Sequence, residues 1–173
     1  RVDWVSTNAV HHVPNTDPDQ IGVNANLEDF LGGDFNQNFL LWSAFVTGEY
    51  DVSCHWTATG GFGYAMRPPT LTELYATDTF LAILQQGFSF VRGNPNLDPE
   101  RLFQLDLGLR GDYGDFRTGT HGFYKWIQDY ITYSSFATTP GLPDSLGVKF
   151  VNTDWATISG FETYGEYDCN CWT

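Results

Sequence analysis

Residues 101–110 carry the clearest alternation of hydrophobic and polar positions in the chain. Successive side chains of a β-strand point to opposite faces, so this period of two predicts a strand with one apolar and one polar face. A compact turn at 111–115 follows, and a second strand completes a hairpin over residues 101–133. The apolar positions are Phe103, Leu105, Leu107 and Leu109, and the polar or small positions between them are Gln104, Asp106, Gly108 and Arg110.

Turn-forming residues divide the chain into strands that are joined alternately by long and short connections. In addition to the hairpin, strands are expected at 1–9, 39–50, 55–66 and 147–168. Short turns fall near 51–54, 111–115 and 168–171, and long loops rich in Pro, Asp, Asn and Gly fall at 10–38, 70–100 and 134–146. In an antiparallel meander this alternation places every long loop at one end. The sequence therefore predicts an all-β fold, an antiparallel meander of strands with the sorted connections that are typical of an outer-membrane β-barrel.

The composition of the two strand faces fits a membrane barrel. A face made of Gly, Gln, Asp, Arg, Thr and Glu would form a poor packed core but a suitable wall for a wet lumen. Aromatic residues near strand ends fit the belts at membrane interfaces, although aromatic residues also favour strands in general. These residues are Trp42, Trp56, Trp126, Tyr130, Tyr133 and Tyr167.

Three sequence boxes resemble the barrel of a TonB-dependent outer-membrane receptor. The first reads RPPTLTELYA from Arg67, the second GNPNLDPE from Gly93, and the third ends the hairpin with FYKWIQDYI. The stretch VNTDWATISGFETYGEYD resembles the family's next strand. The family motif positions in this chain are Arg67, Pro68, Asn94, Pro95, Leu97, Pro99 and Glu100.

The resemblance implies an outer-membrane receptor that takes up a scarce nutrient, such as a ferric siderophore, cobalamin or a glycan. It also implies transport energised by TonB, a barrel of 22 strands in outer-membrane lipid, and a plug inside the barrel. Residues 1–173 are expected to form a partial barrel domain of six or seven strands without a plug domain, as a piece of a longer protein.

In such a receptor the long loops would contact a small-molecule ligand. Candidate contacts in the loop at 70–100 are Tyr75, Phe80, Phe88, Phe90 and Asn94. Haem receptors of the resembled family carry a histidine between the two boxes, whereas residues 70–93 here contain none, although Tyr75 could ligate iron in principle. The alternative is that the boxes only shape the base of the loop, because proline fixes φ and Asn-Pro favours a turn.

No cofactor, metal site or catalytic group is expected. The net charge of −13 excludes a basic nucleic-acid surface and indicates either a solvated acidic surface or acidic loops that concentrate a cation. Glu162 and Glu166 would lie about 13 Å apart on a strand, too far for a glycosidase pair. His11 and His12, near Asp17 and Asp19, form either a metal-binding tip or a solvated loop. The chain is predicted not to be an enzyme.

The three cysteines, Cys54, Cys169 and Cys171, fall at the short-turn end and lack zinc-ligand spacing. Three strand positions at about 4.8 Å each place Cys54 about 14 Å from Cys169. A disulfide requires Cα atoms within about 7 Å. Cys54 is therefore expected not to pair with Cys169 or Cys171.

A different class of protein, a secreted, acidic, aromatic-rich lectin or adhesin domain, would also fit a β-rich chain of this composition. Such a domain would bind glycans by aromatic stacking. It would bury its apolar strand faces and stay soluble without detergent, whereas a barrel segment would need detergent or lipid.

Overall fold

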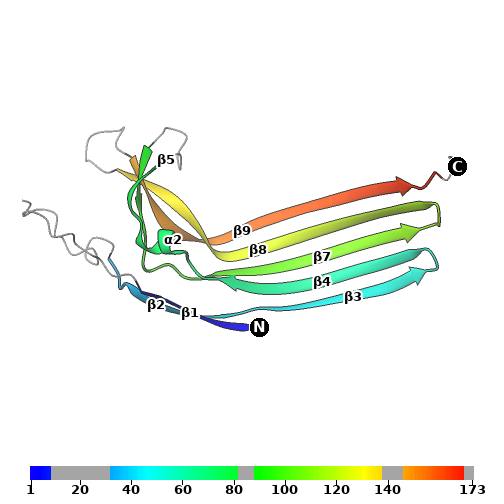
Figure 1. The fold of residues 1–173 in the computed structure, drawn as a ribbon, viewed down its shortest axis with the longest axis horizontal. Coiled ribbons are helices and arrows are strands. Elements are labelled where there is room, and N and C mark those ends of the chain that lie inside the picture. The colour runs from blue at the N-terminus through cyan, green and yellow to red at the C-terminus, as the bar shows by residue number, and fades with distance from the viewer. Residues whose placement is uncertain (9–31, 82–87, 138–145, 170–173) are drawn as a thin grey trace, which may run out of the picture.

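The computed structural model of the chain describes residues 1–8, 32–81, 88–137 and 146–169. These residues form strands and one short helix (Figure 1). In chain order the elements are β1 (Val2–Asn8), β2 (Asn36–Trp42), β3 (Ala44–Ser53), β4 (Trp56–Arg67), α2 (Leu71–Tyr75), β5 (Thr77–Leu81), β6 (Phe88–Arg92), β7 (Glu100–Asp112), β8 (Phe116–Ala137) and β9 (Leu146–Tyr167). Within the described ranges, no helix has the length and apolar character needed to span a bilayer.

Seven strands form one sheet in the order β3-β4-β7-β8-β9-β6-β5, and β1 pairs with β2 in a separate ladder. From β3 to β9 the neighbouring strands are antiparallel. The β3–β4 and β7–β8 turns lie at the end where β9 finishes, and the strand ends that flank the long connections, such as the end of β4 and the start of β7, lie at the opposite end (Figure 1). These observations confirm the predicted all-β meander with its sorted connections.

The segment 70–100 has more structure than the sequence predicted. It holds helix α2, as the expected helical turn, and also the hairpin β5–β6. β6 pairs in parallel with β9, with Val91 opposite Val148. Both hairpin strands contain β-prone residues, but with five residues each they are too short for a period of two to stand out.

The strand expected at 39–50 is divided at Ser43. Its N–H donates to the carbonyl of Arg1 at 2.9 Å, and its carbonyl accepts from the Arg1 amino group at 3.0 Å. On one side of Ser43 β2 pairs with β1, and on the other side β3 pairs with β4. With this division and the two strands of the β5–β6 hairpin, the described residues form nine strands, where six or seven were expected.

The hairpin β8–β9 is longer than predicted and extends past its neighbours at the loop end. Each strand has 22 residues, and together they reach into the segment 134–146 that was expected to be a loop. Asp129 of β8 has a left-handed φ of 56° and lies between the Gln128–Trp155 and Tyr130–Thr153 pairs. The two strands turn out of the plane of the sheet toward the loop end (Figure 1).

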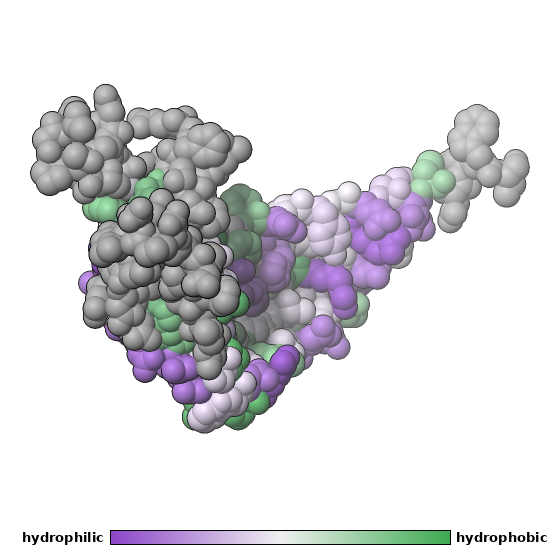
Figure 2. Space-filling view, turned by 60° about the vertical axis from the view of Figure 1, so that its left-hand side comes forward, coloured by the Kyte–Doolittle hydropathy of each residue, from purple (hydrophilic) through white to green (hydrophobic). Residues whose placement is uncertain are grey.

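Register gives the sheet two chemically different faces. Residues opposite one another share a face, so Val46, Phe62 and Leu105 stand together on what we call the apolar face. Asp106 and the residues in register with it stand on the other side, the polar face. Figure 2 shows hydrophilic side chains along the strands that lead away from the loop end. The charged or amide side chains of the polar face are Glu49, Asp51, Gln104, Asp106, Arg110, Asp112, Arg117, His121, Lys125, Glu162 and Glu166.

Buried hydrophobic side chains gather at the loop end. Leu74 of α2 is fully buried, and its cluster contains Phe39, Leu41, Leu97 and Ile131. Farther along the strands, the apolar face of the described sheet is open: Leu107 is 59% exposed. Exposed apolar area costs about 25 cal/mol per Å² relative to burial, so this face requires a cover that is itself apolar.

Candidate ligand-binding loop and its base

An ion cluster closes the base of the segment 68–99. Arg67 ends β4 and Glu100 begins β7, and the two residues are paired in register. Arg67 Nε donates to Glu100 Oε2 at 2.6 Å. The Arg67 Nη1 and Nη2 atoms donate to Glu73 Oε2 and Oε1 of α2 at 3.0 and 3.2 Å. One guanidinium thus joins β4 and β7 to the helix, and the bidentate contact fixes the orientation of the helix.

Helix α2 starts where the sequence provides a cap. Pro68 and Pro69 end β4 after Arg67, because proline has no N–H to donate to the hydrogen-bond ladder of a sheet. Thr70 then forms a capping box with Glu73: its Oγ1 accepts from the Glu73 N–H at 3.2 Å, and its own N–H donates to Glu73 Oε2 at 2.6 Å. Glu73 therefore caps the helix and binds Arg67 with the same carboxylate.

The carboxyl of Glu73 is held ionised. Its burial alone would raise its pKa, but hydrogen bonds from Arg67 and Thr70 and the charge of Arg67 outweigh burial and lower the pKa below its ordinary value. A carboxyl whose pKa is lowered by folding stabilises the fold above its unfolded pKa of about 4.3. This contribution is lost as the pH falls through the lowered pKa.

Replacing Glu73 with Gln is expected to lower the free energy of unfolding by about 1–2 kcal/mol at pH 7, because the charged hydrogen bonds to Arg67 become neutral. The difference between the two proteins should shrink toward zero as the pH falls from the unfolded pKa of about 4.3 through the lowered pKa of folded Glu73. Urea unfolding in lipid vesicles from pH 7 to pH 3 measures this difference. A constant difference over that range would show that the charge of Glu73 does not stabilise the loop base.

Glu100 connects the ion cluster to a third strand, β8. Its side chain is buried, and its Oε1 accepts from the backbone N–H of Ile131 in β8 at 2.8 Å. Ile131 in turn belongs to the buried cluster around Leu74. The carboxylate of Glu100 therefore links the adjoining ends of β4 and β7 to Ile131 within β8.

The second sequence box attaches the loop to β9. The Nδ2 of Asn94 donates to the carbonyl of Phe150 at 3.1 Å, and its N–H donates to the carbonyl of Glu73 at 2.9 Å. Gly93 passes so close to α2 that a Cβ at this position would overlap the carbonyl of Leu74. Only glycine fits there without a shift of the helix.

Asn152 of β9 binds the end of the same loop. Its Nδ2 donates to the carbonyls of Asp98 at 3.0 Å and Asp129 at 2.6 Å, and its Oδ1 accepts from the Asp98 N–H at 2.9 Å. The loop end is thereby tied to the position where β8 has its left-handed residue. Sequence reasoning identified neither Asn152 nor Glu73 as a site residue; the Thr70–Glu73 capping-box spacing was the available signal for Glu73.

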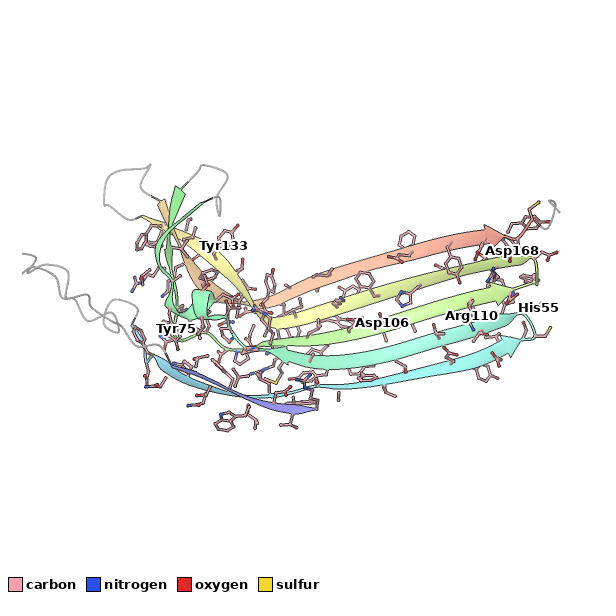
Figure 3. All side chains as sticks on the ribbon, in the orientation of Figure 1. His55, Tyr75, Asp106, Arg110, Tyr133 and Asp168 are labelled. Carbon is pink, nitrogen blue, oxygen red and sulfur yellow. The ribbon has the colours of Figure 1, made fainter. Side chains whose placement is uncertain are left out.

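The predicted contact residues fall into two groups. Tyr75 lies at the loop base (Figure 3), where its hydroxyl donates to the carbonyl of Phe35 at 2.9 Å and lies 3.1 Å from the Thr7 hydroxyl. Asn94 belongs to the same base. Phe90 is in β6, opposite Gly147 of β9, and is half-buried. Phe80 and Phe88 are in β5 and β6, but their side chains lie outside the described set.

The remaining motif positions are packed into this base. Pro95 is fully buried, Leu97 belongs to the cluster around Leu74, and Pro68 and Pro99 are half-buried. His11 and His12, with the acidic residues near them, lie outside the described residues. In the part of the chain that is described, no three His, Cys, Asp or Glu side chains are grouped closely enough to hold a metal ion.

The chain belongs to the TonB dependent receptor-like, beta-barrel family, whose model matches residues 1–173. The fold is similar to that of the copper transporter OprC, with 24% identity and a TM-score of 0.59 over 80% of this chain and 19% of that one. It is similar to the siderophore receptor PirA from Pseudomonas aeruginosa, with 18% identity and a TM-score of 0.60 over 74% of this chain and 26% of that one. It is also similar to the hemophore receptor HasR from Serratia marcescens, with 22% identity and a TM-score of 0.59 over 78% of this chain and 21% of that one.

No curated protein matches the chain. The chain spans between 19% and 26% of the length of these three structures. The family match confirms the resemblance that the boxes after Arg67 and Gly93 indicated, and it confirms the barrel fold class. Members of this family are receptors and transporters.

Proposed function

We propose that the chain forms part of the wall of an outer-membrane receptor that captures a small nutrient ligand and transports it with energy delivered through TonB. The observation that carries this proposal is the family match over residues 1–173. The described strand ends next to the long connections lie together at one end of the sheet, which supports the proposal because barrels of this kind keep long loops on the extracellular side.

The apolar face has the dimensions of a membrane band. Near the loop end Trp42 stacks on Tyr64, with 4.0 Å between the ring centroids, and Tyr64 meets Phe103 edge-on, with 4.9 Å between the centroids. Near the short turns the rings of Trp56 and Tyr113 meet edge-on, with 6.1 Å between their centroids, and Trp56 lies opposite Gly111. The segment of β7 from Phe103 to Gly111 holds about nine residues, which fits the about 9–11 residues that a transmembrane strand tilted by about 45° needs to cross the bilayer core.

A secreted lectin would bury this apolar face against protein, whereas the described sheet leaves it open, with Leu107 and Phe161 exposed. Membership of a family of receptors and transporters also supports a barrel segment over a secreted lectin or adhesin domain. We therefore assign the open face to outer-membrane lipid.

For the ligand we propose a small iron chelate, such as a ferric siderophore, or cobalamin. The similar structures include a siderophore receptor, a hemophore receptor and a copper transporter. Haem ligation by Tyr75 is disfavoured because its hydroxyl already bonds to Phe35. Contacts from Phe80, Phe88 and Phe90 remain the proposal for the β5–β6 hairpin, and Asn94 and Tyr75 are proposed to position that hairpin.

The test is uptake of radiolabelled ligand by cells that express the full native reading frame and lack other receptors. A panel of ferric catecholate, ferric hydroxamate, cobalamin, haem and copper should give TonB-dependent uptake of one iron chelate or of cobalamin. Phe90→Ala is expected to weaken binding of that ligand about tenfold or more, the loss typical of a central aromatic contact. Phe161→Ala, on the apolar face, is the matched control. Uptake that is independent of TonB, or absent for the whole panel, would contradict the proposal.

A further inference from the structure

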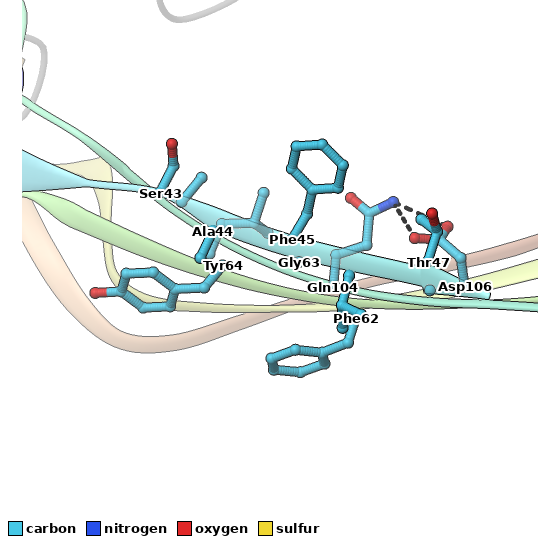
Figure 4. Close-up of a pocket in the computed structure, with 13 residues that line it drawn as sticks. Ser43, Ala44, Phe45, Thr47, Phe62, Gly63, Tyr64, Gln104 and Asp106 are labelled. Atoms are coloured by element: carbon cyan, nitrogen blue, oxygen red, sulfur yellow. Dashed lines mark hydrogen bonds between the residues drawn. The ribbon is translucent and has the colours of Figure 1, made fainter. Parts of the chain in front are cut away.

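A hollow of about 350 Å³ opens on the polar face over β3, β4 and β7. Phe45 and Thr47 of β3 stand on the same side of the sheet as Gln104 and Asp106 of β7, and Tyr64 and Phe62 point to the opposite side (Figure 4). Two glycines of β4, Gly61 and Gly63, lie between these strands and form the floor. This hollow is separate from the loop base around Arg67.

The hollow exists because its floor lacks side chains. A Cβ at Gly63 would meet no described atom within 4 Å, and one at Gly61 would come no closer than 3.4 Å to Thr47. Glycine weakens a strand because it adds backbone entropy and packs nothing. Next to this floor Phe45 is 84% exposed, although it stands on the polar face. An open floor beside an uncovered ring provides a surface for an apolar stem.

A carboxylate at the edge of the hollow is held in one orientation. Gln104 Nε2 donates to both oxygens of Asp106, at 2.9 and 2.8 Å (Figure 4). The Asp106 side chain is only 29% exposed, and His121 Nε2 lies 3.7 Å from its Oδ1. Among the described residues, no Lys or Arg nitrogen lies within 4.0 Å of this carboxylate. A partly buried carboxylate without a permanent cation beside it favours binding a positive group.

We propose that this hollow binds an organic cation, a guanidinium or alkylammonium group carried on an apolar stem. The cationic group would pair with the carboxylate of Asp106, and a guanidinium can do so with two parallel N–H donors. The stem would lie on the Gly61–Gly63 floor, and the face of Phe45 would add a cation–π contact. The inference requires that the polar face line the lumen, and it does not depend on the ligand proposed above.

The cation has two sources with the same chemistry: a free small molecule in the lumen, or a basic side chain of the same protein that reaches this wall. Two substitutions remove the site by different routes. Asp106→Asn removes the charge and keeps the shape, and Gly63→Leu places a side chain in the hollow at a position where a Cβ would meet no described atom within 4 Å. Gly48→Leu is the matched control, because a Cβ at Gly48 also meets nothing described within 4 Å but points to the apolar face.

The experiment uses protein from the full native reading frame in detergent, with L-arginine amide as the probe and the neutral citrulline amide as its match. If the cation is free, calorimetry should show arginine amide binding at least tenfold tighter than citrulline amide. Asp106→Asn and Gly63→Leu should each weaken the binding tenfold or more, and Gly48→Leu should not change it.

If a basic side chain of the same protein occupies the hollow, the free probe will not bind. Asp106→Asn and Gly63→Leu should then lower the melting temperature of the probe-free protein by about 2 °C or more relative to Gly48→Leu. The proposal is overturned if the probe binds but neither substitution weakens its binding. It is also overturned if the probe does not bind and both variants have the same melting temperature as Gly48→Leu.

Discussion

Replacing Leu107 with arginine is expected to prevent most of the protein from assembling into a folded barrel. Leu107 stands midway between the Phe103 and Gly111 positions of β7, and so at the middle of the apolar band. Its side chain is 59% exposed on the apolar face, near Gly60 of β4. An arginine at the bilayer midplane on the lipid face costs about 2–4 kcal/mol. Refolding into vesicles, followed by the heat-modifiable gel mobility of the folded barrel, measures the assembled fraction.

Thr47→Arg is the matched control for this experiment. It introduces the same side chain at another exposed position, on β3, but on the polar face. In a water-filled lumen the arginine should reduce assembly little. Equal losses for both substitutions would mean that the two faces have the same surroundings, and would contradict the assignment of the apolar face to lipid.

Removing the Glu100 carboxylate is expected to open the base of the loop. In Glu100→Ala the N–H of Ile131 loses its acceptor, and Arg67 keeps only Glu73 as its partner. The Arg67 side chain is 42% exposed, so breaking its ion pair with Glu100 should cost less free energy of unfolding than breaking a fully buried pair. Together with the unpaired N–H of Ile131, the total cost should be about 2–3 kcal/mol. Hydrogen exchange of the Ile131 amide should accelerate by about 30- to 150-fold, the factor that corresponds to this free energy.

Glu162→Ala removes a carboxylate of the same type from an exposed position on β9. Its effect on the exchange of Ile131 should be negligible, because no contact joins it to the loop base among the described residues. Unchanged exchange in Glu100→Ala would show that the cluster around Arg67 does not hold the loop. Ligand uptake by the Glu100→Ala receptor then reports whether loop position matters for binding.

The meander could be predicted from the sequence because strand faces and turns are local signals. The period of two at residues 101–110 located β7, and the proline pair after Arg67 marked the end of β4. The division at Ser43 could not be predicted, because β2 and β3 pair with different strands, β1 and β4, that lie far apart in the sequence. The parallel pairing of β6 with β9 is likewise a tertiary contact without a local pattern.

The loop base was only partly predictable for the same reason. The boxes after Arg67 and Gly93 were correctly placed at the two ends of one loop, and the interpretation that they shape its base fits the contacts of Asn94 with β9. The binding role expected for Tyr75 stays a prediction, and its hydroxyl packs against β1 and Phe35 instead of facing an open surface. Asn152 binds residues that are 23 and 54 positions away in the chain, and such long-range contacts leave no local pattern in a single sequence.

The central claim is that the apolar face of β7 contacts lipid and the polar face contacts water. Single spin labels at positions 105, 107 and 109, and at 104 and 106, test it directly in a receptor whose Cys54, Cys169 and Cys171 are replaced by serine. Collision rates with oxygen, which concentrates in lipid, and with a water-soluble nickel chelate are then measured in vesicles. Labels at 105, 107 and 109 should collide preferentially with oxygen, and labels at 104 and 106 should be shielded from lipid. If the odd positions are shielded from lipid and the even positions face it, the membrane assignment is contradicted and the apolar face must pack against protein.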